Sequence, residues 1–240
     1  MNKSQDLRTE EHPVSAHTSR VYDEELASLR ASVLELGQEV LLQARNSLEA
    51  IVNKDVDLAR SIFQAENAVN ASELEIDARV VATIARRGPV GSDLRLIISV
   101  SKEVVDLERI GDEVAKIAGI VGSIFGSNNL VPNHELIRCV HQMGTLAINT
   151  LDKAIKIYDA LDEVGARELR GENHLLEDAF QDGIRHLVTY VMEDSRNIGF
   201  RVNMVLAMKA YERIAAHAHN LAEFVIYQVE GEDVRHSNSQ

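Results

Sequence analysis

The sequence predicts an all-α protein built as a tandem repeat of two long three-helix bundles, with six helices in all. Three observations support this fold class. Apolar residues recur at steps of three and four along most of the chain. Only three prolines interrupt 240 residues, so long helices are permitted. A stretch of the first half also returns in the second, as LERIGDEVAKIA at 107–118 and YERIAAHAHNLA at 211–222.

Composition and charge limit the classes of function. Apolar residues make up 45% of the chain but aromatic residues only 4%, so the core must be aliphatic, which suits helix packing. The formal charge of −13 repels a phosphate backbone, and nucleic acid is therefore not expected as a partner. Cys139 is the single cysteine, so no intrachain disulfide can form. A reducing compartment fits best.

Residues 1–20 form a polar segment that contains Pro13 and shows no periodicity, which indicates a disordered tail. This segment lacks the hydrophobic region of a signal peptide. No later run approaches the roughly 18 apolar residues that a membrane span needs. We therefore expect a cytoplasmic protein without direct membrane insertion.

Three helices are expected in a first repeat over residues 21–127. The first helix carries an apolar stripe to about residue 52, and the second runs over 55–87 because Gly88-Pro89 stops it. The third is expected to be capped by Ser92. Its apolar stripe consists of Ile97, Val100, Val104, Leu107, Gly111, Val114, Ala118, Val121 and Phe125.

A second repeat is expected over residues 133–234, after a linker rich in Gly, Ser and Asn. Its first helix breaks near Gly165, and its second carries Leu176. The third runs from about Asn197 to Glu230 and matches the third helix of the first repeat at an offset of 104. Its stripe consists of Tyr211, Ala215, Ala218, Ala222, Val225 and Val229.

Two pairs of acids are the candidate metal ligands of the first repeat. Glu73 with Asp77, and Glu108 with Asp112, are four residues apart, so each pair shares a helix face beside the apolar stripe. Antiparallel packing would bring four carboxylates together as an oxygen-rich site for Mg, Mn or Fe. Because 38 of 240 residues are acidic, ordinary solvated faces are the alternative interpretation.

The second repeat departs from this pattern, because Ala216 replaces one acid and Phe180 and Ile184 align with the acids of the second helix. A weaker site that contains imidazole, and so also suits Zn, is expected from Glu177, Glu212, His219 and Glu223. The alternative is that His217 and His219 are ordinary surface or capping side chains.

No catalytic motif supports an enzyme. The chain has no phosphate-binding G-x-x-x-x-G-K-[ST] loop, no G-x-S-x-G elbow and no H-E-x-x-H. No Glu stands three residues before any histidine, so the di-iron E-x-x-H motif is absent. The prediction is therefore a protein that is not an enzyme. A carboxylate-bridged, metal-dependent hydrolase or oxidase on the first-repeat acids is the alternative.

Three segments resemble the PhoU family of accessory regulators of phosphate-specific ABC import. They are SDLRLIISVSKEVVDLERIGDEVAKIA at 92–118, MEDSRNI at 192–198, and ERIAAHAHNLAEFVIYQVEGEDVRH at 212–236. The resemblance covers nearly all of the chain after the tail and implies a tandem pair of three-helix bundles. Ala215 and Ala216 depart from the usual second E-R-I-G-D motif and remove a carboxylate ligand.

The resemblance also implies metal sites and a regulatory role. The E(D)-x-x-x-D motifs of the family hold metal ions, and the four first-repeat acids match them. Such proteins restrain phosphate uptake and the phosphate-starvation response when phosphate is ample. The implied partners are the ATPase subunit of the phosphate ABC importer, the phosphate sensor histidine kinase and a second copy of the chain in a homodimer.

Overall fold

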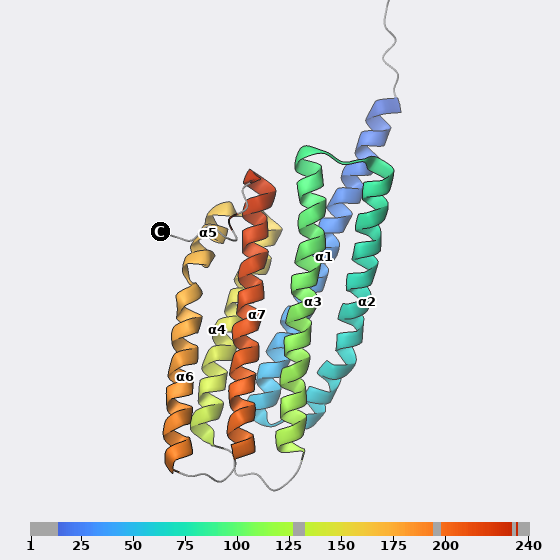
Figure 1. The fold of residues 1–240 in the computed structure, drawn as a ribbon. Coiled ribbons are helices and arrows are strands. Elements are labelled where there is room, and N and C mark those ends of the chain that lie inside the picture. Colours follow the sequence, from blue (N-terminus) through green and yellow to red (C-terminus); the bar gives the residue numbers. More distant parts are fainter. Residues whose placement is uncertain (1–13, 127–132, 194–197, 232–233, 235–240) are drawn as a thin grey trace, which may run out of the picture.

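Seven helices make up the part of the chain that the computed structural model describes, which is residues 14–126, 133–193, 198–231 and 234. The helices are α1 (Val14–Asn53), α2 (Val56–Arg87), α3 (Gly91–Phe125), α4 (His134–Ala160), α5 (Glu163–Gly171), α6 (Asn173–Glu193) and α7 (Ile198–Glu230). In Figure 1 the long helices run along one axis, with α2 and α6 at opposite edges and α3 beside α7 in the middle. The all-α prediction is confirmed for the described residues.

The helices pack in two groups that join along two helix pairs. The helices α1, α2 and α3 contact one another, and α7 contacts each of α4, α5 and α6. Between the groups, α3 packs along α7 and α1 packs against α4. The linker expected between the repeats falls largely on residues 127–132, which lie outside the described part of the chain, so the domain boundary stays a prediction.

Helix α1 begins earlier than expected. It starts at Val14, within the segment interpreted as a tail, and residues 1–13 of that segment lie outside the described residues. A polar composition alone therefore did not locate the start of the helix.

Local capping explains where α2 begins and ends. The Asp55 carboxylate accepts hydrogen bonds from the backbone N–H groups of Asp57 and Leu58, at 3.0 and 2.9 Å. Gly88 ends the helix with φ of 56°, a left-handed conformation that suits glycine. The expected Ser92 cap of α3 is wrong, because the helix starts at Gly91 and Ser92 lies inside its first turn.

The break near Gly165 produces a short additional helix. Leu161 ends α4 with φ of 50°, and the Asp162 carboxylate accepts a hydrogen bond from the Gly165 N–H at 3.0 Å, which caps α5. Helices α5 and α6 together take the place of the single helix expected between α4 and α7.

The predicted stripes form a continuous aliphatic core. On α3, every stripe residue from Ile97 to Val121 is buried, and on α7 the stripe is buried from Tyr211 to Val225. Val229 is the exception at 45% exposed, because it lies in the last turn of α7. Gly144 of α4 allows this helix to pack closely against α1 and α7. A Cβ atom at this residue would lie 2.6 Å from Leu48 Cδ1 and 3.1 Å from Tyr211 Cζ.

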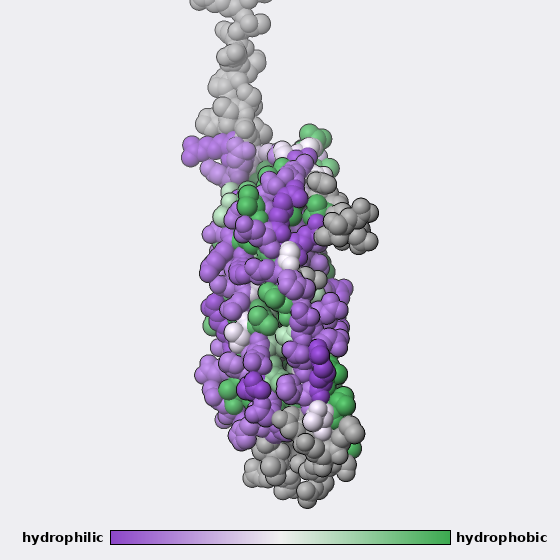
Figure 2. Space-filling model, turned by 90° about the vertical axis from the view of Figure 1, so that its left-hand side faces the viewer, coloured by the Kyte–Doolittle hydropathy of each residue, from purple (hydrophilic) through white to green (hydrophobic). Residues whose placement is uncertain are grey.

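The surface on the side of α6 is mostly hydrophilic. Figure 2 shows this face, where hydrophobic residues gather in a narrow strip along the middle. In the described part of the chain, no helix is long and apolar enough to span a membrane.

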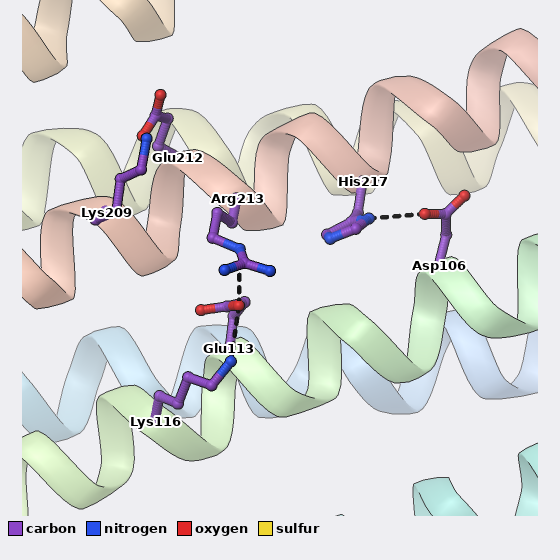
Figure 3. A network of polar contacts seen from close by, with 7 residues as sticks. All are labelled: Asp106, Glu113, Lys116, Lys209, Glu212, Arg213 and His217. Atoms are coloured by element: carbon purple, nitrogen blue, oxygen red, sulfur yellow. Dashed lines mark hydrogen bonds and ion pairs between the residues drawn. The ribbon is translucent and has the colours of Figure 1, made fainter.

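Buried acids of α3 meet polar groups of α7 where the two groups of helices join (Figure 3). Glu113 Oε1 lies 2.9 Å from both Lys116 Nζ and Arg213 Nε. Asp106 Oδ1 lies 2.7 Å from Nδ1 of His217. The interpretation of His217 as a surface or capping residue is wrong, because packing of α3 against α7 half-buries its ring beside this acid.

Glu103 is the most buried acid of this contact. Its side chain is 0% exposed, its Oε1 accepts a hydrogen bond from Gln228 Nε2 at 2.6 Å, and its Oε2 has no partner among the described residues. Burial raises the pKa of Glu103 to about 8, with a smaller contribution from Asp106, while Gln228 and Arg30 oppose the shift. The carboxyl is therefore protonated over much of the physiological range.

The variant Glu103→Gln should remove a pH dependence of stability. An unfolded Glu titrates at about pH 4.3, so between that pH and about 8 the folded chain holds one more proton than the unfolded chain. The free energy of unfolding of the wild type should then fall with rising pH, by up to about 1.4 kcal/mol per pH unit from this group. Urea denaturation at pH 5, 6.5 and 8 measures the difference.

The exposed Glu168→Gln on α5 is the matched control and should keep the wild-type pH dependence. Parallel stability curves for Glu103→Gln and the wild type would contradict the assignment.

Candidate functional site

The first-repeat acids gather where α2 packs against α3. Burial raises the pKa of Glu108, and the charges of Asp112, Glu73 and Glu66 raise it further, while Arg109 opposes them. The four predicted ligands, Glu73, Asp77, Glu108 and Asp112, are all partly exposed. Two of the predicted ligands, Glu73 and Asp112, therefore lie close enough to a third, Glu108, for their charges to act on it.

A glycine lets the two helices approach at this point. A Cβ atom on Gly111 would lie 3.2 Å from Val69 Cγ1 of α2, a contact tighter than usual. Gly111 lies between Glu108 and Asp112 in the α3 sequence, so close packing at Val69 brings both acids toward α2. The glycine of the E-R-I-G-D motif at 108–112 thus helps to position the two carboxylates of that motif.

The structure adds two features to the predicted site, a partner for Asp77 and a further acid, Glu66. The Asp77 carboxylate accepts a hydrogen bond from Ser101 Oγ of α3 at 3.1 Å, a contact that the spacing did not predict. Glu66 joins the cluster although it was not predicted. Its signal in the sequence was its position seven residues before Glu73, which places both on one helix face two turns apart.

Two of the three predicted second-repeat acids, Glu212 and Glu223, are paired with cations. Glu212 forms an ion pair with Lys209 of the same helix. Glu223 Oε1 lies 3.2 Å from Arg170 Nε of α5. Glu177 is exposed on α6. Each of these two acids therefore has a cation beside it, which weakens its attraction for a metal ion.

His219 is buried without a hydrogen-bond partner. Its side chain is 8% exposed, and among the described residues neither ring nitrogen has a partner. Burial lowers the pKa of His219, while the charge of Glu172 raises it and that of Lys153 lowers it. Glu172, which sequence reasoning missed, accepts hydrogen bonds from Lys153 Nζ through both oxygens, at 2.9 and 2.7 Å.

The two repeats therefore differ in their capacity to attract a cation. In the described residues, no three His, Cys, Asp or Glu side chains are arranged to hold a metal ion. The first repeat nevertheless concentrates negative charge around Glu108, which favours a hard cation with oxygen ligands. The described residues supply this charge, but no three of them are arranged as ligands around one point. Metal binding by the first-repeat acids, and by the second-repeat residues, therefore stays a prediction.

Comparison with known proteins gives matches over both halves. The family model described as "PhoU domain" matches residues 33–121 and 140–225. A Burkholderia sp protein, named phosphate-specific transport system accessory protein PhoU homolog, is 35% identical over 223 residues, which cover 93% of this chain and 94% of its own. A protein of Escherichia coli (strain K12), named phosphate-specific transport system accessory protein PhoU, is 32% identical over 223 residues, with coverages of 93% and 91%.

Two crystal structures share the fold. PhoU from Pseudomonas aeruginosa superposes with a TM-score of 0.82 at 34% identity, covering 88% of this chain and 100% of that one. The phosphate transport system regulatory protein PhoU from Streptococcus pneumoniae gives a TM-score of 0.79 at 27% identity, covering 88% and 98%.

Removing one neighbouring charge should lower the pKa of Glu108. Asp112→Asn keeps the shape of the side chain but deletes the largest charge contribution to the raised pKa. NMR detection of the Glu108 carboxyl carbon during a pH titration measures the change. Glu168→Gln on α5 is the control and should leave the titration of Glu108 unaltered. An unchanged pKa in Asp112→Asn would show that the two carboxylates do not interact.

Proposed function

The chain belongs to the PhoU family, and from this premise we propose that it restrains phosphate uptake and the phosphate-starvation response when phosphate is ample. Its relatives are named accessory or regulatory proteins of phosphate transport, so the chain has an accessory or regulatory role in phosphate transport. The match of the family model to both halves carries the proposal. The alternative of a metal-dependent hydrolase or oxidase gains no support from these relatives, which are named accessory proteins of a phosphate-specific transport system.

The proposed mechanism is that of a cytoplasmic adaptor. One partner is the ATPase subunit of the phosphate ABC importer, and the other is the phosphate sensor histidine kinase. Both partners use ATP, which places their contacts with an adaptor in the cytoplasm. Long helices such as α2 and α6 offer extended outer faces for protein contacts. The adaptor would couple the state of the importer to that of the kinase without chemistry of its own.

We further propose that the first repeat binds a metal ion through Glu73, Asp77, Glu108 and Asp112. The charges of Asp112 and Glu73 near Glu108 support this site, because a cation relieves the repulsion between carboxylates. Carboxylate ligands suit Mg, Mn and Fe. A bound ion would tie α2 to α3 and so stabilise the first repeat.

Deleting the gene should derepress phosphate-starvation genes in medium with ample phosphate. The physical reason is the loss of the contact that reports importer state to the kinase. A transcriptional reporter of one such gene should rise several-fold in the deletion strain, and expression of the full chain from a plasmid should return it to the basal level. Normal repression in a deletion strain without another copy of the gene would contradict the regulatory proposal.

Removing two first-repeat carboxylates should abolish metal binding. The purified full chain is loaded with Mn²⁺ or Fe²⁺, separated from free metal, and its metal content is measured by elemental analysis. Glu108→Gln with Asp112→Asn should lose the metal, because it deletes two charged ligands while conserving side-chain size. Glu168→Gln should retain it.

Equal metal content in the double variant and the wild type would exclude this site. Since the deletion phenotype does not depend on metal content, the two proposals can fail separately.

A further inference from the structure

The first half of α7 carries an exposed apolar stripe. Ile198, Val202 and Leu206 follow one another at steps of four, so they lie along one face of the helix. Their exposed fractions are 54%, 51% and 52%. Single exposed apolar residues are common on protein surfaces, whereas an aligned set of large ones is typical of a surface that binds another molecule.

Packing inside the chain does not require this stripe to be apolar. The buried face of the same part of α7 consists of Phe200, Met204, Ala207 and Met208. At the offset of 104 that aligns the two repeats, Leu206 corresponds to Lys102 of α3. The helical frame therefore accepts a charged residue at this position, and core packing does not explain the leucine.

The same face of α7 continues as a basic region. Lys209 follows Leu206 by three residues, and Arg213 follows Lys209 by four. Figure 3 shows Lys116 of α3 beside this region, where Lys116 Nζ and Arg213 Nε both lie 2.9 Å from Glu113 Oε1. The side chains of the three cations are about half exposed, at 52% for Lys209, 49% for Arg213 and 55% for Lys116.

Three cations meet two carboxylates in this region. Lys116 and Arg213 share Glu113, while Lys209 pairs with Glu212. One positive charge is therefore left over, in a chain whose formal charge is −13. The acid cluster of the first repeat lies between α3 and α2 rather than between α3 and α7. Because salt screens distant charges, the basic region attracts a negatively charged group at short range although the whole chain repels one at a distance.

We propose that this face of α7 binds an amphipathic, acidic helix of a partner protein. The α7 face consists of Ile198, Val202, Leu206, Lys209 and Arg213, and it spans about 22 Å along the helix axis. Apolar side chains of the partner cover the first two turns, and its Asp or Glu side chains pair with the cations of the next two turns. Such a helix is one partner of the proposed adaptor, so this binding rests on the proposed function.

A helix fits the geometry of the α7 face. The five residues recur at steps of three and four, which is the pattern by which one helix packs against another. An extended segment gains affinity largely from backbone hydrogen bonds to its partner. Helix α7 offers few of these, because its own N–H and C=O groups are paired within the helix.

Two other occupants match the α7 face less well. A second copy of this chain, packed antiparallel about a two-fold axis, would set Lys209 and Arg213 against Ile198 and Val202 and so bury charge on apolar surface. Parallel packing would set cations against cations. An anionic membrane is repelled at long range by the formal charge of −13.

Fluorescence anisotropy of a labelled synthetic peptide, titrated with the purified full chain, tests this binding. The acidic peptide is about five turns long, with leucines at steps of three and four along one face and glutamates on that face near one end. It should bind with a dissociation constant in the micromolar range, and the affinity should fall as salt rises. The basic peptide, with lysines in place of the glutamates, should bind at least about tenfold more weakly.

Variants of the α7 face separate the apolar contribution from the charged one. Leu206→Ser should raise the dissociation constant of the acidic peptide about tenfold, because it removes apolar surface without adding charge. Lys209→Gln should raise it several-fold and reduce its dependence on salt. Val81→Ser and Arg60→Gln on α2 are the matched controls, since both side chains are exposed but lie off the α7 face, and each should bind as the wild type does.

Reversal of charge in the basic region tests the choice of an acidic partner. Lys209→Glu with Arg213→Glu should bind the basic peptide more tightly than the acidic one. Far-UV circular dichroism checks that each variant keeps its helix content. If the double variant loses helix content because Glu113 is left without Arg213, Lys209→Glu alone keeps that pair and should still narrow the preference for the acidic peptide.

Four results would overturn the proposal: no binding of the acidic peptide at about 1 mM; equal affinity for the acidic and basic peptides; variants of the α7 face that bind as the controls do; or loss, in Leu206→Ser, of self-association or of binding to phosphatidylglycerol vesicles, which would assign the face to a second copy or to a membrane. The peptide assay uses neither a deletion strain nor phosphate. Failure of this binding and failure of the proposed function are therefore measured separately.

Discussion

The contact between α3 and α7 is the constraint on which the rest of the structure depends. Its acids Glu103, Asp106 and Glu113 are buried, and each reaches a polar or cationic group of α7. A buried carboxylate is costly unless it is protonated, hydrogen-bonded or paired, so sliding one helix along the other would leave these acids uncompensated. Their pairing therefore specifies how the two groups of helices align, and this alignment sets which faces remain at the surface.

The two repeats share a helical pattern but differ in electrostatics. In the first, the acids of α2 and α3 influence one another around Glu108. In the second, Phe180 stands where the first repeat has an acid, and Lys209 Nζ lies over its ring at 5.2 Å while also pairing with Glu212. An aromatic ring and a lysine thus replace the clustered carboxylates. The same helical arrangement therefore holds clustered carboxylates in one half and a contact between a lysine and an aromatic ring in the other.

An accessory or regulatory protein acts through its surfaces, and the arrangement of helices decides which surfaces exist. The helices α3 and α7 carry many buried residues, whereas α2 and α6 lie at opposite edges of the molecule in Figure 1. The outer face of α2 is apolar over four turns, while the surface on the side of α6 is mostly hydrophilic. The two edges therefore offer partners different chemistry.

Helical periodicity determined the fold class, the buried stripes and the acids that share a face, because spacings of three and four residues are local geometry. It placed Glu108 beside Asp112 correctly for that reason. Only the tertiary structure decided that Glu66 joins them, that His217 pairs with Asp106, and that Glu172 is the acid that influences His219. Such contacts depend on the rotation and register of one helix against another, which the period of a single helix does not specify.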